Sequence, residues 1–170
     1  LVHSLAYADT QDLSKPFSET LRDGFNKAME ISAYSLLPLA KGVIPMMRKR
    51  GGGSIVSMSF IGSTLAVPNY NVMGPAKAAL ESCTRYLARE LGPENIRINS
   101  LSPGAIRTLS SAGIKDISEM IRVAGEHSAM KRTATQAEVA NTAAFLLSDA
   151  ASGITGQLIY VDCGYSIMAN

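Results

Sequence analysis

The sequence lacks tryptophan, and aromatic residues make up only 6% of its 170 positions. It also lacks an excess of charge: the formal net charge is +2, and Lys and Arg are scattered apart from short runs at 48–50 and 131–132. Without a continuous basic stripe we expect no nucleic-acid partner, and we interpret each short run as a solvated helix end. No apolar run approaches the about 18 residues of a membrane-spanning helix, so we expect no membrane segment.

Cysteine is scarce as well. Cys83 and Cys163 lie far apart, without metal-ligand spacing, and no signal peptide precedes them. This usage is typical of reduced thiols in a cytoplasmic protein. His3 and His127 also have no partner at metal-ligand spacing, so we expect no metal site.

The composition that remains suits one globular domain. With 46% hydrophobic and 18% charged residues, 170 positions can bury one sizeable core but not two ordinary ones. The chain opens at Leu1 inside an apolar stretch and without an initiator Met, so we expect a fragment, a processed product or part of a longer chain.

Short apolar stretches bounded by turn residues predict four strands, at 1–8, 54–60, 96–101 and 158–162. The first stretch fits the end of a buried helix equally well by periodicity. Glycines at 51–53 and Ser102-Pro103-Gly104 mark breaks beside the strands.

Apolar residues at three- and four-residue steps predict helices between these strands. Positions 18–50 suit two helices, the second long, with Pro38 and Pro45 as candidate kinks. A helix is also predicted at 71–91, with Pro75 in its first turn, and another at 135–148, with Thr135 and Glu138 as its capping pair. Alternating strands and helices predict an α/β fold with a doubly wound parallel sheet.

The segment 105–133 has the weakest pattern, because its apolar residues lie among glycines and many polar residues. Two interpretations stay open: a mobile substrate-binding lid, or ordinary surface helices joined by a loop.

Tyr70 and Lys77 are the candidate chemical pair. At about 100° per residue, seven positions nearly complete two helical turns, so both side chains are expected on one helix face. An ammonium near a phenol lowers the phenol's pKa, which suits a proton donor to the oxygen where charge grows during hydride transfer. Taken alone, such a pair is more often a core ring and a solvated ammonium.

The context of this pair resembles the bacterial enoyl-[acyl-carrier-protein] reductases of the short-chain dehydrogenase superfamily. The resemblance covers essentially the whole chain, and its clearest stretches are 3–8, 67–81, 97–109 and 156–164. The Tyr-x6-Lys spacing is its most specific element, because ordinary short-chain dehydrogenases place Lys four residues after Tyr, where this sequence has Gly74.

The resemblance implies the C-terminal portion of a Rossmann-like domain over 1–170, with the substrate lid at 105–133. The family's first three strands and its glycine-rich pyrophosphate turn are absent from these residues, so half of the cofactor site is expected to be missing. The implied cofactor is NADH, with NADPH as the alternative, because the strand end that selects between them is absent as well. We therefore expect the 170 residues alone to bind cofactor poorly and to aggregate.

The resemblance also implies residue roles. Hydride passes to the β-carbon of a trans-2-enoyl thioester, Tyr70 hydrogen-bonds the enolate oxygen, and Lys77 holds the nicotinamide ribose. Further cofactor contacts are implied at Ser4, Leu5, Gly104, Ile106 and Thr108. Substrate contacts are implied at Ala8, Phe60, Met73, Ile114, Ile117 and Met120. Plain core packing is the alternative for Met73, Ile114, Ile117 and Met120.

Phe60 is a departure from the family pattern. Many members have a second tyrosine ten residues before the catalytic one, and Phe cannot donate a hydrogen bond. We expect this change to alter chain-length preference and not to abolish activity.

Two alternatives remain. Ser57 lies thirteen residues before Tyr70, the spacing of the carbonyl-polarising serine in ketoreductases and alcohol dehydrogenases of the superfamily. A catalytically inactive homologue is the other, although it would be expected to lose Tyr70 or Lys77.

The expected partners follow from the resemblance. The substrate is carried on an acidic acyl carrier protein, which Lys115, Lys131 or Arg132 could help to dock. Family members are usually homotetramers packed partly through the helices at 31–50 and 71–91.

Overall fold

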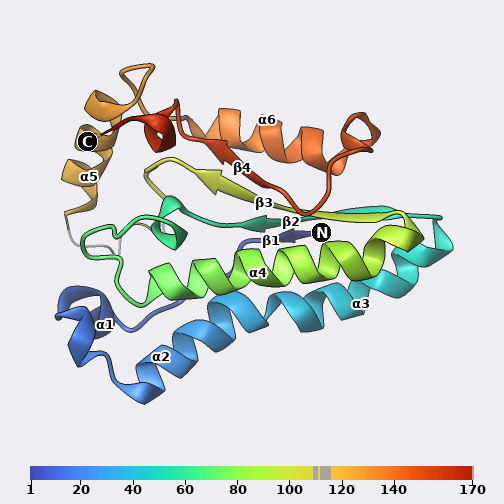
Figure 1. The fold of residues 1–170 in the computed structure, drawn as a ribbon, viewed down its shortest axis with the longest axis horizontal. Helices are drawn as coiled ribbons and strands as arrows, with labels where there is room; N and C mark the ends of the chain where they lie inside the picture. Colours follow the sequence, from blue (N-terminus) through green and yellow to red (C-terminus); the bar gives the residue numbers. More distant parts are fainter. Residues whose placement is uncertain (109–110, 112–115, 170) are drawn as a thin grey trace.

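The computed structural model describes residues 1–108, 111 and 116–169. Their centre is a four-stranded parallel sheet in the order β1-β2-β3-β4, shown in Figure 1. The strands are β1 (Val2–His3), β2 (Gly53–Met58), β3 (Ile96–Pro103) and β4 (Leu158–Val161). All pairings are parallel, which confirms the predicted α/β class.

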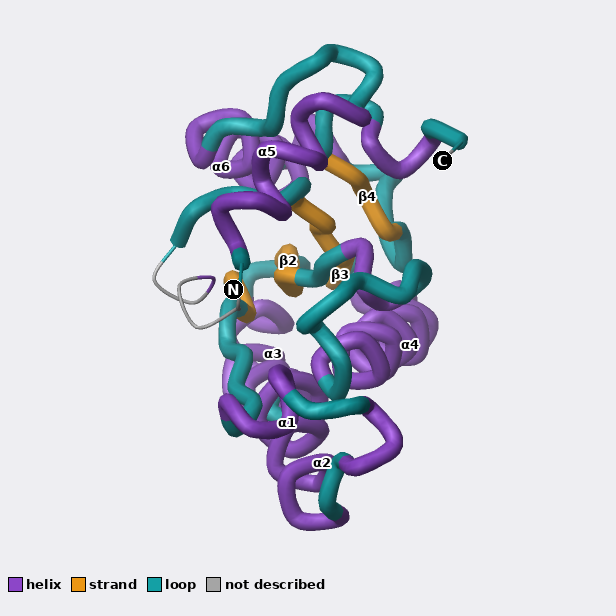
Figure 2. Tube along the Cα trace, turned by 90° about the vertical axis from the view of Figure 1, so that its left-hand side faces the viewer, coloured by secondary structure: helices purple, strands orange, loops and turns teal. Residues whose placement is uncertain are grey.

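Helices cover both faces of this sheet. On one face lie α2 (Arg22–Met29), α3 (Leu36–Lys49) and α4 (Met73–Leu91), and on the other lies α6 (Gln136–Leu147) (Figures 1 and 2). Figure 1 places α5 (Ile117–His127) at the end of the molecule toward which the strands point, and α1 (Thr10–Ser14) beside α2. Short 3₁₀ turns lie at Phe17–Glu19, Ile61–Ser63, Gly92–Glu94, Asp149–Ala151 and Tyr165–Ile167.

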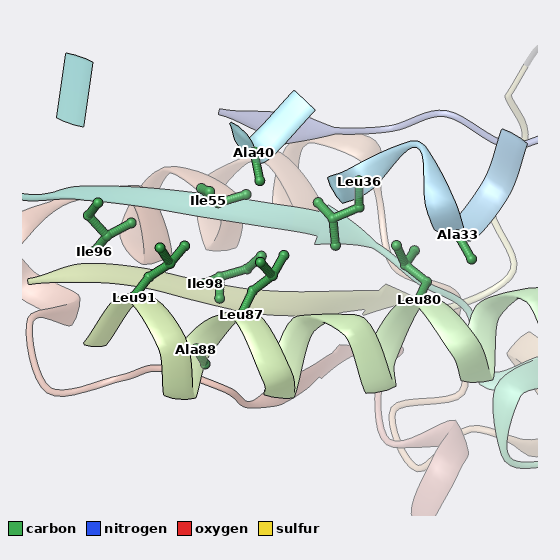
Figure 3. Close-up of a cluster of buried hydrophobic side chains, with 10 residues drawn as sticks. All are labelled: Ala33, Leu36, Ala40, Ile55, Leu80, Leu87, Ala88, Leu91, Ile96 and Ile98. Atoms are coloured by element: carbon green, nitrogen blue, oxygen red, sulfur yellow. The ribbon is translucent and has the colours of Figure 1, made fainter. Parts of the chain in front are cut away.

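Successive residues of β2 face the two helical layers in turn. Ile55 packs with residues of α3, α4 and β3 such as Leu36, Leu80 and Ile98, as Figure 3 shows. Val56 instead joins the cluster beneath α6. A sheet that is apolar on both faces needs a helical layer on each, and each fully buried Leu or Ile contributes roughly 1.5–3 kcal/mol.

The predicted helices within 18–50 are present, but what separates them is a π turn. It occupies Glu30–Tyr34 between α2 and α3. Pro38 has no N–H to offer the carbonyl of Tyr34, so the regular ladder cannot run through this point. Pro45 lies inside α3, which continues past it to Lys49.

The first strand is shorter than predicted. Only Val2 and His3 pair with β2, opposite Val56 and Ser57. The following residues leave the sheet and form a wall of the site described below.

The capping prediction for α6 is confirmed. The Thr135 side chain accepts from the N–H of Glu138, whose carboxylate accepts from the N–H of Thr135. Pro75 lies in the first turn of α4, as predicted.

Within the described residues, no helix has the length and apolar character to cross a membrane. The same residues contain no group of three or more His, Cys, Asp or Glu side chains that could hold a metal ion.

Candidate active site

A cavity of about 470 Å³ opens at the carboxyl ends of the first three strands. Ser4 follows β1, Ser59 follows β2 and Gly104 follows β3, and all three line it. This edge is where doubly wound sheets bind their ligands, and the volume is in the usual range for a small-molecule site.

The cavity brings together most of the predicted site residues. Its lining includes Tyr70, Lys77, Ser4, Gly104, Ile106, Thr108, Ala8, Phe60, Met73, Ile117 and Met120. Leu5, which is 49% exposed, does not line it, although its neighbours Ser4 and Ala6 do. Ile114 and Lys115 lie outside the described residues, as does part of the predicted lid at 105–133. The part of that segment that is described includes α5, which contributes Ile117 and Met120.

Tyr70 does not belong to α4, the helix that carries Lys77, contrary to the expectation of one shared helix face. It precedes α4 in a turn whose flanking residues, Asn69 and Asn71, have left-handed backbones (φ 60° and 39°). The Asn71 amide ties this turn to the carbonyls of Leu13 and Lys15, at 3.0 and 2.8 Å. Asparagine tolerates this conformation better than most residues, so the turn can aim the phenol into the cavity.

The Tyr70 ring is held tightly and is 7% exposed. Its centroid lies 4.8 Å from that of Phe60, with the planes tilted by 58°. A Cβ atom on Gly62 would lie 2.4 Å from the same ring, so only glycine leaves room for it. Burial and the negative charge of Glu81 raise the pKa of Tyr70. The expectation of a lowered phenol pKa is therefore wrong, because desolvation of the phenolate outweighs any nearby cation.

Lys77 reaches the cavity from the second turn of α4 and is 5% exposed. Its Nζ donates to the carbonyl oxygen of Met58, the last residue of β2, at 2.7 Å. Burial lowers the pKa of Lys77 to about 8, and Glu81 opposes that shift. The ammonium form is thus the majority form at neutral pH.

Ser59 and Glu81 are site residues that the sequence analysis missed. Ser59 lines the cavity, and its hydroxyl donates to the carboxylate of Glu81, which is 7% exposed. One signal was available: Glu81 follows Lys77 by one helical turn, so the two share a helix face.

The structure disfavours the ketoreductase interpretation at both of its marker positions. Ser57 is fully buried, and its hydroxyl bonds with those of Thr84 (3.0 Å) and Ser100 (2.8 Å), away from the cavity lining. At position 74, a Cβ atom would lie 2.8 Å from the carbonyl oxygen of Gly62. The backbone therefore leaves no space there for the lysine of an ordinary short-chain dehydrogenase.

The cavity residues fit the nicotinamide end of a dinucleotide. An ammonium has three N–H donors, one of which Lys77 gives to Met58, and the group borders the cavity together with the hydroxyl-bearing Ser4. Ile106 and Ala6 add apolar wall. Donors for ribose hydroxyls beside an apolar seat for the ring form the donor set that this cofactor needs.

A doubly wound sheet with a buried Tyr and Lys at its carboxyl edge is the arrangement expected for the short-chain dehydrogenase superfamily. The family model described as "Enoyl-(Acyl carrier protein) reductase" matches residues 1–166. This chain belongs to that family.

Similar proteins of known sequence and structure support this family assignment. The enoyl-[acyl-carrier-protein] reductase [NADH] FabI of Nostoc sp. is 54% identical over 168 residues, which are 99% of this chain and 64% of the relative. The [NADPH] FabI of Staphylococcus aureus strain MRSA252 is 48% identical over 96% of this chain and 63% of its own length. The solved structure of the Bacillus cereus enoyl-acyl carrier protein reductase with NADP+ and indole naphthyridinone superposes with a TM-score of 0.95 at 45% identity, covering 99% of this chain and 65% of that one. The chain thus spans just under two thirds of the length of these relatives.

Proposed function

We propose that the protein to which this chain belongs reduces the 2,3-double bond of trans-2-enoyl thioesters on acyl carrier protein, in cytoplasmic fatty acid biosynthesis. The carrying observation is that Tyr70 and Lys77, seven residues apart, border one cavity while position 74 has no room for a side chain. That arrangement favours the enoyl reductases over the ketoreductases of the superfamily.

A reduced nicotinamide, when bound, supplies the hydride that goes to the β-carbon of the substrate. We expect NADH, with NADPH as the alternative, since the relatives carry both labels. Lys77 and Ser4 would hold the ribose, and Gly104, Ile106 and Thr108 would border the nicotinamide and phosphate end.

The chain's own residues then stabilise the enolate charge, and protonation of the α-carbon completes the reduction. Tyr70, kept protonated by its raised pKa, donates a hydrogen bond to the thioester oxygen as enolate charge develops. Phe60 cannot donate, so Tyr70 acts on that oxygen without a second tyrosine at this position. Met73, Ile117 and Met120, with Ala8, exclude water and receive the acyl chain.

We further propose a homotetramer packed partly through α3 and α4. These helices leave large apolar side chains exposed, Met46 (59%) on α3 and Tyr86 (73%) on α4. Exposed apolar area of this kind is typical of an interface. Lys131 and Arg132 lie on the surface beyond α5, where they could meet an acidic carrier.

The test is oxidation of the reduced nicotinamide by the full-length protein, with a crotonyl thioester beside an acetoacetyl thioester. We expect turnover of the enoyl substrate. Reduction of the ketone alone would support the ketoreductase interpretation and make Ser57 the next residue to vary.

A further inference from the structure

Glu81 is a buried carboxylate that the proposed mechanism does not use. It lies on α4, one turn beyond Lys77, and is 7% exposed. Among the described residues no salt bridge reaches it, although a buried charge is costly unless other groups compensate it. A buried carboxylate next to the cavity residues therefore suggests a specific role.

The hydrogen bonds around Glu81 lead directly to the catalytic pair. Ser59 donates its hydroxyl to Glu81 and its backbone N–H to the carbonyl of Leu101, at 2.8 Å. The residue before it, Met58, accepts from the Lys77 ammonium at 2.7 Å. The residue after it, Phe60, contacts the Tyr70 ring. Three consecutive residues, 58–60, therefore hold Lys77, Glu81 and Tyr70 in that order.

The charge of Glu81 acts on the same two groups. It raises the pKa of Lys77 against the effect of burial, and it raises the pKa of Tyr70 further. His3, on β1, also interacts with Lys77; burial first and Lys77 second lower the pKa of His3. The carboxylate of Glu81 therefore favours the ammonium form of Lys77.

We propose that Glu81 is a positioning residue of this site: it anchors the 58–60 segment through Ser59, and its carboxylate lies one helical turn from the buried Lys77 that borders the cavity with Tyr70. Its kinetic readout rests on the proposed function, but its effect on cofactor binding does not.

Glu81→Gln in the full-length protein separates charge from geometry, because the amide oxygen can still accept from Ser59. Enoyl turnover and cofactor affinity, followed by fluorescence quenching, are measured from about pH 6 to about pH 10. We expect the alkaline limb of both profiles to move toward lower pH by about half a unit or more, while kcat near pH 6 falls less than about threefold. Glu90→Gln, the same change at an exposed position of α4, should move neither profile. Alkaline limbs that coincide with those of the wild type would overturn the electrostatic part of the proposal.

Ser59 tests the anchoring from the other side of the hydrogen bond. Ser59→Ala keeps the charge of Glu81 but removes its partner, so kcat should fall about tenfold without a shift of the alkaline limb. Ser59→Thr retains the hydroxyl and should restore most of the activity, which a merely space-filling role would not predict. Unchanged kcat in a folded Ser59→Ala protein would contradict the anchoring role.

The proposed function and the proposed role of Glu81 can be refuted independently. If the wild type does not reduce an enoyl thioester, the proposed function is wrong, and the cofactor-affinity profile of Glu81→Gln still decides the role of Glu81.

Discussion

Burial acts in opposite directions on the two ionisable side chains at the centre of the site. It raises the pKa of the Tyr70 phenol and lowers that of the Lys77 ammonium to about 8, because in each case it disfavours the charged form. In the proposed reaction Tyr70 therefore acts as a hydrogen-bond donor that keeps its proton. The pKa of Lys77 lies close to neutral pH, so a modest rise in pH deprotonates the ammonium.

We predict that cofactor affinity falls as pH rises through about 8, and that a Lys77→Met variant lacks this decrease.

The free energy of unfolding changes with pH in the opposite direction. The pKa of Lys77 falls from 10.5 to about 8 on folding, so between these values the unfolded chain binds more protons and the free energy of unfolding rises with pH. Urea unfolding at about pH 7 and about pH 10 measures this, and a wild-type increment equal to that of Lys77→Met would contradict it.

Phe60 is expected to influence which enoyl chain lengths are accepted. Its ring packs against Tyr70 at the cavity wall, so Phe60→Tyr adds a hydroxyl at the wall proposed to receive the substrate. We expect the preference among enoyl chain lengths to change. Phe17→Tyr, at an exposed ring outside this cavity, is the control. Identical chain-length profiles for Phe60→Tyr and the wild type would refute the idea.

At the scale of elements, periodicity predicted the strands and the long helices, because the residues that pack in the core recur with the period of each element. The structure bears this out for β2, β3 and α6. Periodicity could not predict that Tyr70 lies outside α4, because the turn depends on two left-handed asparagines and on carbonyls supplied by residues 13 and 15. The contact between Ser59 and Glu81 could not be predicted either, because it joins residues 22 positions apart, although the spacing of Glu81 from Lys77 was visible in the sequence.

At the scale of elements, we predict that Arg97 stabilises the packing of α6 against β3. This buried residue of β3 donates to the carbonyls of Leu146 and Ser148 at the end of α6, each at 2.9 Å. Arg97→Ala removes both of these charged donors, although Ser54 still donates to the carbonyl of Leu146. The free energy of unfolding should therefore fall by about 1.5–3 kcal/mol, the usual range for hydrogen bonds to a charged group. Arg85→Ala, on the exposed face of α4, should cost less than about 0.5 kcal/mol in the same urea titration. Equal losses would show that α6 does not depend on this cap.

At the scale of the whole molecule, β1 is an edge of the sheet over the described residues. It pairs with β2 on one side, and Val2 is 48% exposed. Unpaired N–H and C=O groups along an apolar edge template aggregation. We predict that the 170 residues expressed alone aggregate and bind cofactor poorly, which light scattering and fluorescence titration would show. A monodisperse chain with micromolar cofactor affinity would contradict this.

The central claim is that Tyr70 donates to the developing enolate oxygen. It is tested most directly in the full-length protein by comparing Tyr70→Phe with the wild type on a crotonyl thioester at saturating cofactor. We predict that kcat falls by about 10² or more while cofactor affinity stays within about threefold, because the variant loses only the donor. Turnover within about threefold of the wild type would contradict the account and remove Tyr70 from the chemistry.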